Sequence, residues 1–185
     1  GYLTIKERIP TPAGPAYMLQ LPNHEVRTAL NQSLLSVWLP DYGVVLEAGL
    51  SFYRYLAQND QERLRSHLER LFASIPYDWY RNNSIAQYEG YYASVFYSHL
   101  AALGLDITAE DVSNFGRCDL AIRFEGRVYI FEFKVIEGEE ATGEALQQLL
   151  SRDYAAKYRD GKTEVVQISI EFSQSKRQVV GWEVR

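Results

Sequence analysis

The sequence has very little cysteine and histidine for its 185 residues: a single cysteine, Cys118, and three scattered histidines. One cysteine excludes an internal disulfide framework, and this set offers no spacing that would form a zinc site. No apolar run approaches the roughly 20 residues needed to cross a bilayer, and no charged-then-apolar leader opens the chain. We therefore expect a soluble protein of a reducing cytoplasm with no membrane partner.

The sequence also lacks an excess of basic residues. Its formal net charge is −5 at pH 7, which argues against a strongly basic surface for nucleic acid. A nuclease remains compatible with this charge, because carboxylates clustered at an active site raise the acidic count and are neutralised when a metal ion binds.

The chain begins with glycine rather than methionine, and we expect it to be a piece of a longer protein. Hydrophobic periodicity divides it into two parts. Residues 1–80 are predicted as a linker and helical region, with strands at 2–9 and 16–21 and helices at about 23–38, 44–58 and 60–75. Residues 81–185 are predicted as a domain of order α-β-β-β-α-β-β, with helices at about 82–103 and 144–159 and strands at 105–112, 118–124, 128–135, 163–172 and 178–184.

The segment 128–135 carries the feature that most needs an explanation. Its β-branched and aromatic residues predict a strand, and alternation places Glu132 and Lys134 on one face with Val128 and Ile130. Charges in such a hydrophobic run are costly to bury unless they are paired or coordinate something.

Other acids are predicted to converge on this strand. Glu125-Gly126 is a hairpin signal, and an antiparallel hairpin carries Asp119 toward the end that holds Glu132 and Lys134. Glu89 lies on the preceding predicted helix, although it also fits an ordinary surface acid. Converging carboxylates repel each other unless a cation holds them, and oxygen ligands suit Mg²⁺ or Mn²⁺.

These residues form a pattern of known motifs. Gly116-Arg117-x-Asp119 followed by Glu132-x-Lys134 resembles the PD-(D/E)XK nuclease superfamily. Tyr88-Glu89-Gly90-Tyr91-Tyr92 and Ala145-x-x-Gln148, followed by Tyr154, are similar to the PD-(D/E)XK domain that follows an AAA-ATPase-like domain in many bacterial proteins. Gly1-Tyr2-Leu3-Thr4-Ile5-Lys6 and Leu21-Pro22-Asn23-x-Glu25-Val26-Arg27 are similar to the segment between the two domains of such proteins, so the resemblance covers nearly the whole chain. It implies a mixed α/β fold with a restriction-endonuclease-like αβββαβ core and an N-terminal helical appendage.

The resemblance also implies roles for individual residues. Asp119, Glu132 and Glu89 would bind Mg²⁺ or Mn²⁺, Lys134 would be the catalytic lysine, and Gln148 would contact metal-bound water or substrate. Contacts to substrate phosphate are implied for two further residues, Arg117 and Tyr154. Cys118 replaces the proline that usually precedes the first acid, and no P-loop pattern assigns ATP binding to this chain.

The leading functional hypothesis is metal-dependent hydrolysis of phosphodiester bonds in DNA or RNA, in a larger protein that carries an AAA-ATPase-like domain. The alternative is a catalytically inactive nuclease fold that binds or regulates that ATPase part. Association into a homo-oligomer through an aromatic-rich surface is compatible with either. Arg117 could instead pair structurally with a carboxylate, and the polar helix face and core packing explain Gln148 and Tyr154 almost as well.

Overall fold

The order of helices and strands in the second half of the chain is the one that the sequence predicts. The computed structural model describes residues 2–38, 42–75, 89–113 and 116–185. Its elements are β1 (Thr4–Thr11), β2 (Gly14–Gln20), α1 (His24–Trp38), α2 (Tyr42–Gln58), α3 (Gln61–Ala73), α5 (Glu89–Ala102), β3 (Asp106–Ser113), β4 (Gly116–Phe124), β5 (Arg127–Ile136), α6 (Glu144–Ser151), the 3₁₀ helix η2 (Tyr154–Tyr158), β6 (Glu164–Ser173) and β7 (Gln178–Val184). The predicted capping motif Ser84–Gln87 lies outside the described residues.

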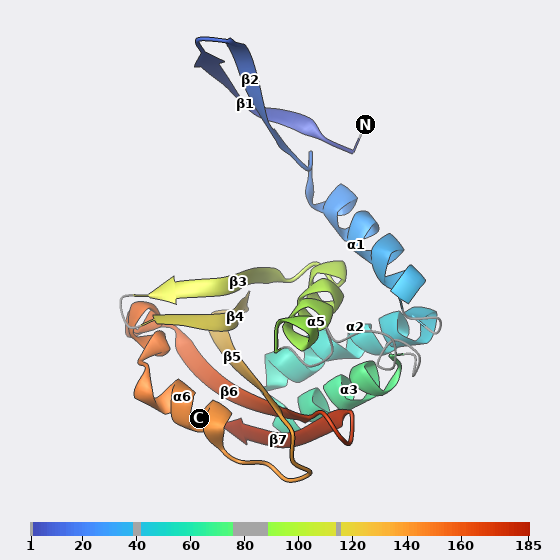
Figure 1. The fold of residues 1–185 in the computed structure, drawn as a ribbon, viewed down its shortest axis with the longest axis vertical. Coiled ribbons are helices and arrows are strands. Elements are labelled where there is room, and N and C mark those ends of the chain that lie inside the picture. The colour runs from blue at the N-terminus through green and yellow to red at the C-terminus, as the bar shows by residue number, and fades with distance from the viewer. Residues whose placement is uncertain (1, 39–41, 76–88, 114–115) are drawn as a thin grey trace.

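The strands of the second half form one sheet in the order β3-β4-β5-β6-β7. Only β5 and β6 pair in parallel, and the other neighbouring strands are antiparallel. A parallel pair needs a crossover connection, and α6 together with η2 supplies it (Figure 1). This mixed α/β architecture confirms the predicted restriction-endonuclease-like fold.

The hairpin between β4 and β5 brings the predicted site residues together. Glu125 and Gly126 have φ angles of 47° and 80°, and two positive φ angles are what a tight two-residue hairpin turn requires. The resulting register pairs Leu120 with Phe131. It places Asp119 at the end of β4 that faces Glu132, as predicted.

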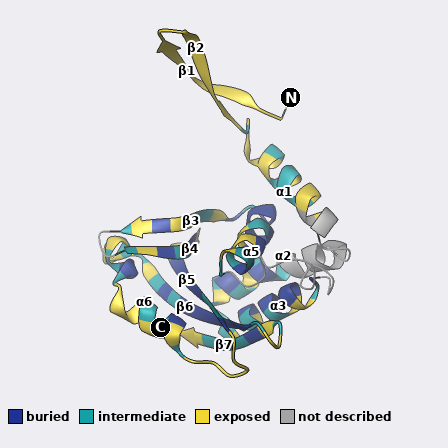
Figure 2. Cartoon of the chain, in the orientation of Figure 1, coloured by how far each residue is buried: buried dark blue, intermediate teal, exposed yellow. Residues whose placement is uncertain are grey.

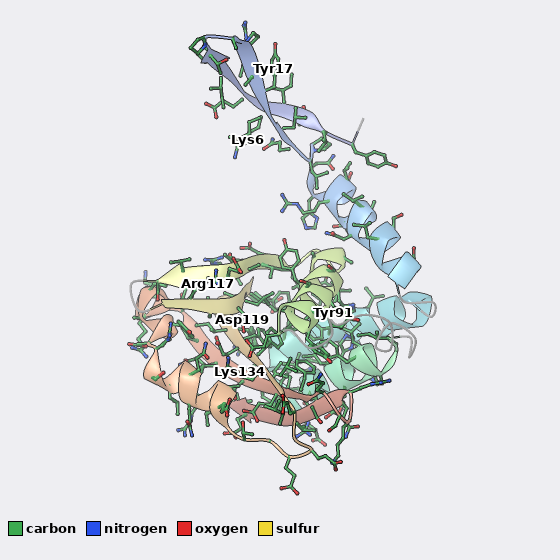
Figure 3. The ribbon with its side chains drawn as sticks, in the orientation of Figure 1. Lys6, Tyr17, Tyr91, Arg117, Asp119 and Lys134 are labelled. Carbon is green, nitrogen blue, oxygen red and sulfur yellow. The ribbon has the colours of Figure 1, made fainter. Side chains whose placement is uncertain are left out.

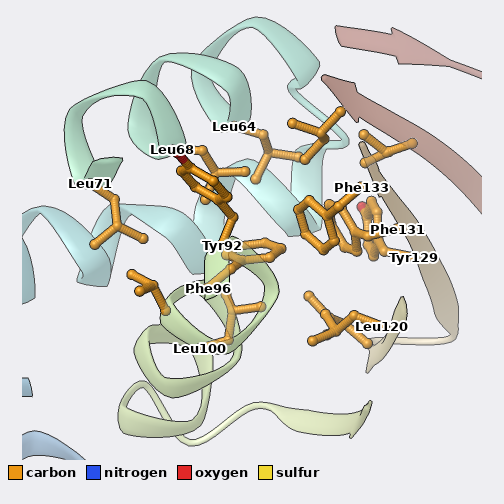
Figure 4. Close-up of a cluster of buried hydrophobic side chains, with 14 of the residues drawn as sticks. Leu64, Leu68, Leu71, Tyr92, Phe96, Leu100, Leu120, Tyr129, Phe131 and Phe133 are labelled. Carbon is orange, nitrogen blue, oxygen red and sulfur yellow. The ribbon is translucent and has the colours of Figure 1, made fainter. Parts of the chain in front are cut away.

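One face of the sheet packs on α2, α3 and α5. Tyr129, Phe131 and Phe133 alternate along β5 and enter this core, where the ring of Phe96 from α5 meets Phe131 at 5.1 Å and Phe133 at 5.6 Å between centroids. Figure 4 shows these rings beside the helices, and Figure 2 shows the buried inner strands. The predicted alternation of β5 is therefore confirmed on this face.

The opposite face of the sheet is covered by α6 and η2. The predicted helix at 144–159 is wrong in length, because α6 ends at Ser151 and the next residue, Arg152, is extended with φ −120° and ψ 110°. Tyr154 then enters a small buried cluster on this face. Lys157 donates to Asp111 Oδ1 over 2.5 Å, and these tertiary contacts replace the last turns of the predicted helix.

The first part of the chain has two structural roles. Both strands of the β1–β2 hairpin are exposed throughout, and in Figure 1 the hairpin projects from the body of the molecule. Helices α2 and α3 instead share the core of the sheet through residues such as Phe52 and Leu68. The predicted boundary near residue 80 falls among residues 76–88, which the structure does not describe, and it stays a prediction. None of the helices in the described ranges has the length and apolar character to cross a membrane.

Candidate active site

Glu132 is a buried carboxylate on the α6 side of the sheet. Only 1% of the residue is exposed, because β5 is a central strand and alternation points this side chain under α6. The Gln148 side chain on α6 donates a hydrogen bond to Glu132 Oε1. Burial, together with the nearby charge of Asp119, raises the pKa of Glu132 to about 8.

Asp119 lies where the β4–β5 ladder ends. The last ladder pair is Leu120 with Phe131, and beyond it Asp119 Oδ2 accepts the backbone N–H of Phe133 over 2.8 Å. Burial raises the pKa of Asp119 although this hydrogen bond opposes the rise. The carboxylate is thereby fixed next to the strand that carries Glu132.

Lys134 follows Glu132 on the same face of β5, and its ammonium group pairs with Glu89. The distance from Lys134 Nζ to Glu89 Oε1 is 2.9 Å, and Glu89 is the first residue of α5. Burial lowers the pKa of Lys134, but the hydrogen bond to Glu89 and the surrounding carboxylates raise it overall. Figure 3 shows Lys134 and Asp119 on neighbouring strands, so the predicted set of four charged residues is brought to one region.

Two further predicted residues lie differently. The Arg117 side chain is 59% exposed, and its Nη1 pairs with Glu110 Oε2 at 3.2 Å. Tyr154 is buried in the cluster with Cys118 and Ile130, so its ring packs in the interior. Their proposed contacts with substrate phosphate stay predictions.

A pocket opens beside Asp119. It has a volume of about 420 Å³ and lies between α5 and strands β3 and β4. Small residues of α5, including Gly90 and Ala93, form one wall with Tyr97, and Asp119 and Leu120 contribute from β4. Asp119 is therefore one of the residues that border an open pocket.

Comparison with known proteins agrees with this geometry. Residues 87–182, just over half of the chain, match the family described as the PD-(D/E)XK nuclease superfamily. The chain belongs to the PD-(D/E)XK nuclease superfamily. A protein named "Uncharacterized protein in vnfD 5'region", from Azotobacter chroococcum mcd 1, is 50% identical over 184 residues, which is all of this chain and 36% of that relative. The chain thus spans about a third of the length of this relative. No solved structure matches the chain.

The carboxylates of this PD-(D/E)XK domain suit a hard divalent cation. Among the residues that the structure describes, the buried Glu132 Oε2 atom has no hydrogen-bond partner, and leaving a buried polar oxygen without a partner is costly. Within the same part of the chain, no three His, Cys, Asp or Glu side chains are grouped as around a metal ion. Mg²⁺ often takes only one or two protein carboxylates and completes its shell with water and substrate phosphate, and a pair of acids such as Asp119 and Glu132 fits that chemistry.

The sequence reasoning missed Glu171, which organises the start of α6. This carboxylate on β6 is 3% exposed and accepts the backbone N–H groups of Thr142, Gly143 and Ala145 over 2.6, 3.1 and 3.0 Å. It therefore holds the helix that presents Gln148 to Glu132. The signal was available, since Glu171 interrupts an apolar strand in the same way as Glu132 does.

Proposed function

We propose that this domain hydrolyses phosphodiester bonds in nucleic acid with the help of Mg²⁺ or Mn²⁺. The observation that carries the proposal is the buried Glu132 carboxylate with one unpartnered oxygen, adjacent to Asp119 and two residues from Lys134. A fold gains nothing from such an arrangement by itself, because each buried carboxylate raises the cost of ionising the other.

Asp119 and Glu132 would hold the divalent cation. When bound, such an ion polarises a phosphoryl oxygen and lowers the pKa of a bound water. Two carboxylates held by other groups favour a defined binding geometry, since Asp119 is fixed by the Phe133 N–H and Glu132 by the Gln148 side chain. Gln148 then acts as a positioning residue for Glu132.

Lys134 would act as a fixed positive charge. Its raised pKa keeps the ammonium group protonated at neutral pH, so it is suited to orienting an attacking water and stabilising negative charge on the phosphoryl oxygens. The Lys134 side chain is 23% exposed, which leaves it open to a substrate. Glu89 would direct the ammonium group through the 2.9 Å contact, and its expected role as a further metal ligand stays a prediction.

Nucleic acid would reach this site along the pocket beside Asp119. The volume of about 420 Å³ lies within the usual range of ligand sites. The superfamily supports nucleic acid as the substrate, and DNA or RNA is distinguished by experiment. An AAA-ATPase-like domain in the same polypeptide remains a proposed partner, together with self-association of the domain.

The direct test is cleavage of plasmid DNA, single-stranded DNA and RNA with Mg²⁺ or Mn²⁺. We expect wild-type cleavage that EDTA abolishes, and a loss of about 100- to 1,000-fold for Lys134→Ala, the range seen when one transition-state donor is removed. The exposed Lys162 offers a matched control, and Lys162→Ala should retain wild-type rates. Equal cleavage by Lys134→Ala would refute the assigned role.

The ion pair between Lys134 and Glu89 supports a second candidate, a non-catalytic binding or regulatory module. In the structure, each of these two groups already has an oppositely charged partner. Calorimetric titration with Mn²⁺ separates the two functions. Binding that Asp119→Asn abolishes supports the enzyme, whereas absence of binding to folded wild-type protein supports the module.

A further inference from the structure

A second pocket of the molecule is lined by arginine. It has a volume of about 630 Å³ and lies between α3 and the turn that joins β6 to β7. Arg65, Arg70 and Arg177 line it, and Glu69 is the one acid among its lining residues in the part of the chain that the structure describes. With three guanidinium groups against one carboxylate, this described lining is locally positive, although the whole chain carries a net charge of −5.

The local structure of α3 directs the first two arginines to the pocket. Leu64, Leu68 and Leu71 bury one face of this helix, and helical periodicity leaves Arg65 and Arg70 on the outer side. Arg65 Nε pairs with Glu69 Oε1 at 2.8 Å, with 44% and 38% of the two side chains exposed. An exposed pair of this kind contributes little energy, so a phosphate can compete for the guanidinium.

The third arginine comes from a constrained turn. Arg177 has a φ angle of 55°, an uncommon conformation for a residue other than glycine, asparagine or aspartate. Its backbone N–H donates to the carbonyl of Ser173 over 2.8 Å. The turn thereby holds Arg177 beside α3, and Figure 1 shows this turn next to that helix.

The pocket lies at the same end of the sheet as the candidate active site. In the parallel β5–β6 pair, Lys134 is opposite Glu171. Strand β6 ends two residues later at Ser173, just before the turn that carries Arg177. Arg177 is close enough to Tyr92 for its charge to oppose the burial that raises the pKa of that hydroxyl to about 12. Tyr92 follows Glu89 by three residues in α5, so α5 carries a residue of the candidate active site and a residue within reach of the Arg177 charge.

We propose that the arginine pocket binds phosphate groups of the nucleic-acid strand that the Asp119–Lys134 site cleaves. This inference rests on the proposed function and adds the element that the acidic chain needs to hold a polyanion, a local cationic site. The planar guanidinium group suits phosphate because it donates two parallel hydrogen bonds. Contacts at a distance from the scissile bond position the strand and carry no chemistry themselves.

The test measures binding of a fluorescein-labelled single-stranded oligonucleotide by anisotropy in EDTA. Arg70→Gln and Arg177→Gln are compared with Arg63→Gln, a control on the same helix whose side chain is 64% exposed, pairs with Asp60 and does not line the pocket. We expect each pocket variant to weaken binding by about 10-fold and to reduce the slope of log affinity against log salt by about 1. The control should change neither quantity.

Two results would overturn the proposal. One is a pocket variant that behaves as Arg63→Gln does, and the other is wild-type protein that binds no oligonucleotide. Arg70 lies in the last turn of α3, where a positive charge also stabilises the helix. Thermal unfolding of each variant identifies a loss of fold, and Arg177→Gln, which lies outside any helix, tests the pocket independently of that effect.

Inorganic phosphate serves as a second probe to separate a strand from a free anion. If only a large excess of phosphate displaces the oligonucleotide, the pocket binds a strand. If phosphate alone binds tightly, and Arg177→Gln loses phosphate binding but keeps oligonucleotide binding, the proposal is contradicted. Failure of the proposed function gives a different pattern. If the arginine variants weaken oligonucleotide binding but the wild type cleaves nothing, the proposed function fails and the assignment of the pocket stands. If the wild type cleaves nucleic acid but the arginine variants bind as it does, the proposed function stands and the assignment of the pocket fails.

Discussion

Replacing Glu132 by glutamine should make the metal-free protein more stable at alkaline pH. Burial and the adjacent Asp119 raise the pKa of Glu132 from 4.5 to about 8. The unfolded chain loses this proton near the lower value, whereas the folded protein retains it up to about pH 8. The free energy of unfolding contributed by Glu132 therefore falls as the pH rises between these two values.

The size of the effect follows from the shift. One pKa unit corresponds to about 1.4 kcal/mol. Between about pH 5 and about pH 8 the wild type releases the Glu132 proton when it unfolds, so its free energy of unfolding falls by roughly 3 kcal/mol over this range. Glutamine carries no titratable proton, and its carbonyl can still accept the hydrogen bond from Gln148. Groups away from Glu132 titrate alike in the two proteins, so the difference between them reports Glu132 together with the charges coupled to it, chiefly Asp119.

Urea unfolding of wild type and Glu132→Gln in EDTA, at several pH values, measures this difference. We expect the variant to gain about 3 kcal/mol relative to wild type between about pH 5 and about pH 8, and added Mn²⁺ to stabilise only the wild type. Parallel pH profiles for the two proteins would show that Glu132 ionises normally and would remove the physical basis of the proposed metal site.

Three further predictions concern groups outside the reacting centre. Glu171→Gln should lower the free energy of unfolding by about 2 kcal/mol, because it weakens charged hydrogen bonds to backbone N–H groups such as that of Ala145; unchanged urea midpoints would contradict this. His67 and His99 share a buried 2.9 Å contact, and burial lowers their pKa values to about 4 and about 3. The free energy of unfolding should therefore fall as the pH is lowered from about 6.5 to about 4, and it should fall less steeply in His67→Gln. Burial raises the pKa of the Cys118 thiol to about 12, so a thiol reagent at about pH 8 should react only after unfolding; rapid labelling of native protein would disprove it.

The sequence was sufficient to predict the five strands of the sheet, one of their hairpins and the position of Glu132 and Lys134. A strand alternates strictly between two faces, so the apolar side chains around these charges locate both of them. The tight turn at Glu125-Gly126 fixes the hairpin register, and that register brings Asp119 to the same end. Local rules were enough because each of these features depends on neighbours in the chain.

Features that depend on long-range contacts were not predictable in this way. The periodicity after Gln148 predicts a longer α6, but packing of Tyr154 against β4 and β5 and the bond from Lys157 to Asp111 end the helix early. The link from Asp119 to the Phe133 backbone also appears only when two strands are paired. Such contacts join residues that no sequence periodicity relates.

The measurement that tests the central claim most directly is metal-dependent cleavage of single-stranded and double-stranded nucleic acid by wild type and Lys134→Ala at equal concentration. The structure predicts cleavage by wild type that needs Mg²⁺ or Mn²⁺ and falls by about 100-fold or more in Lys134→Ala, whose circular dichroism should match wild type. Cleavage of equal rate by the two proteins, or no cleavage by folded wild-type protein with either metal, would contradict the claim.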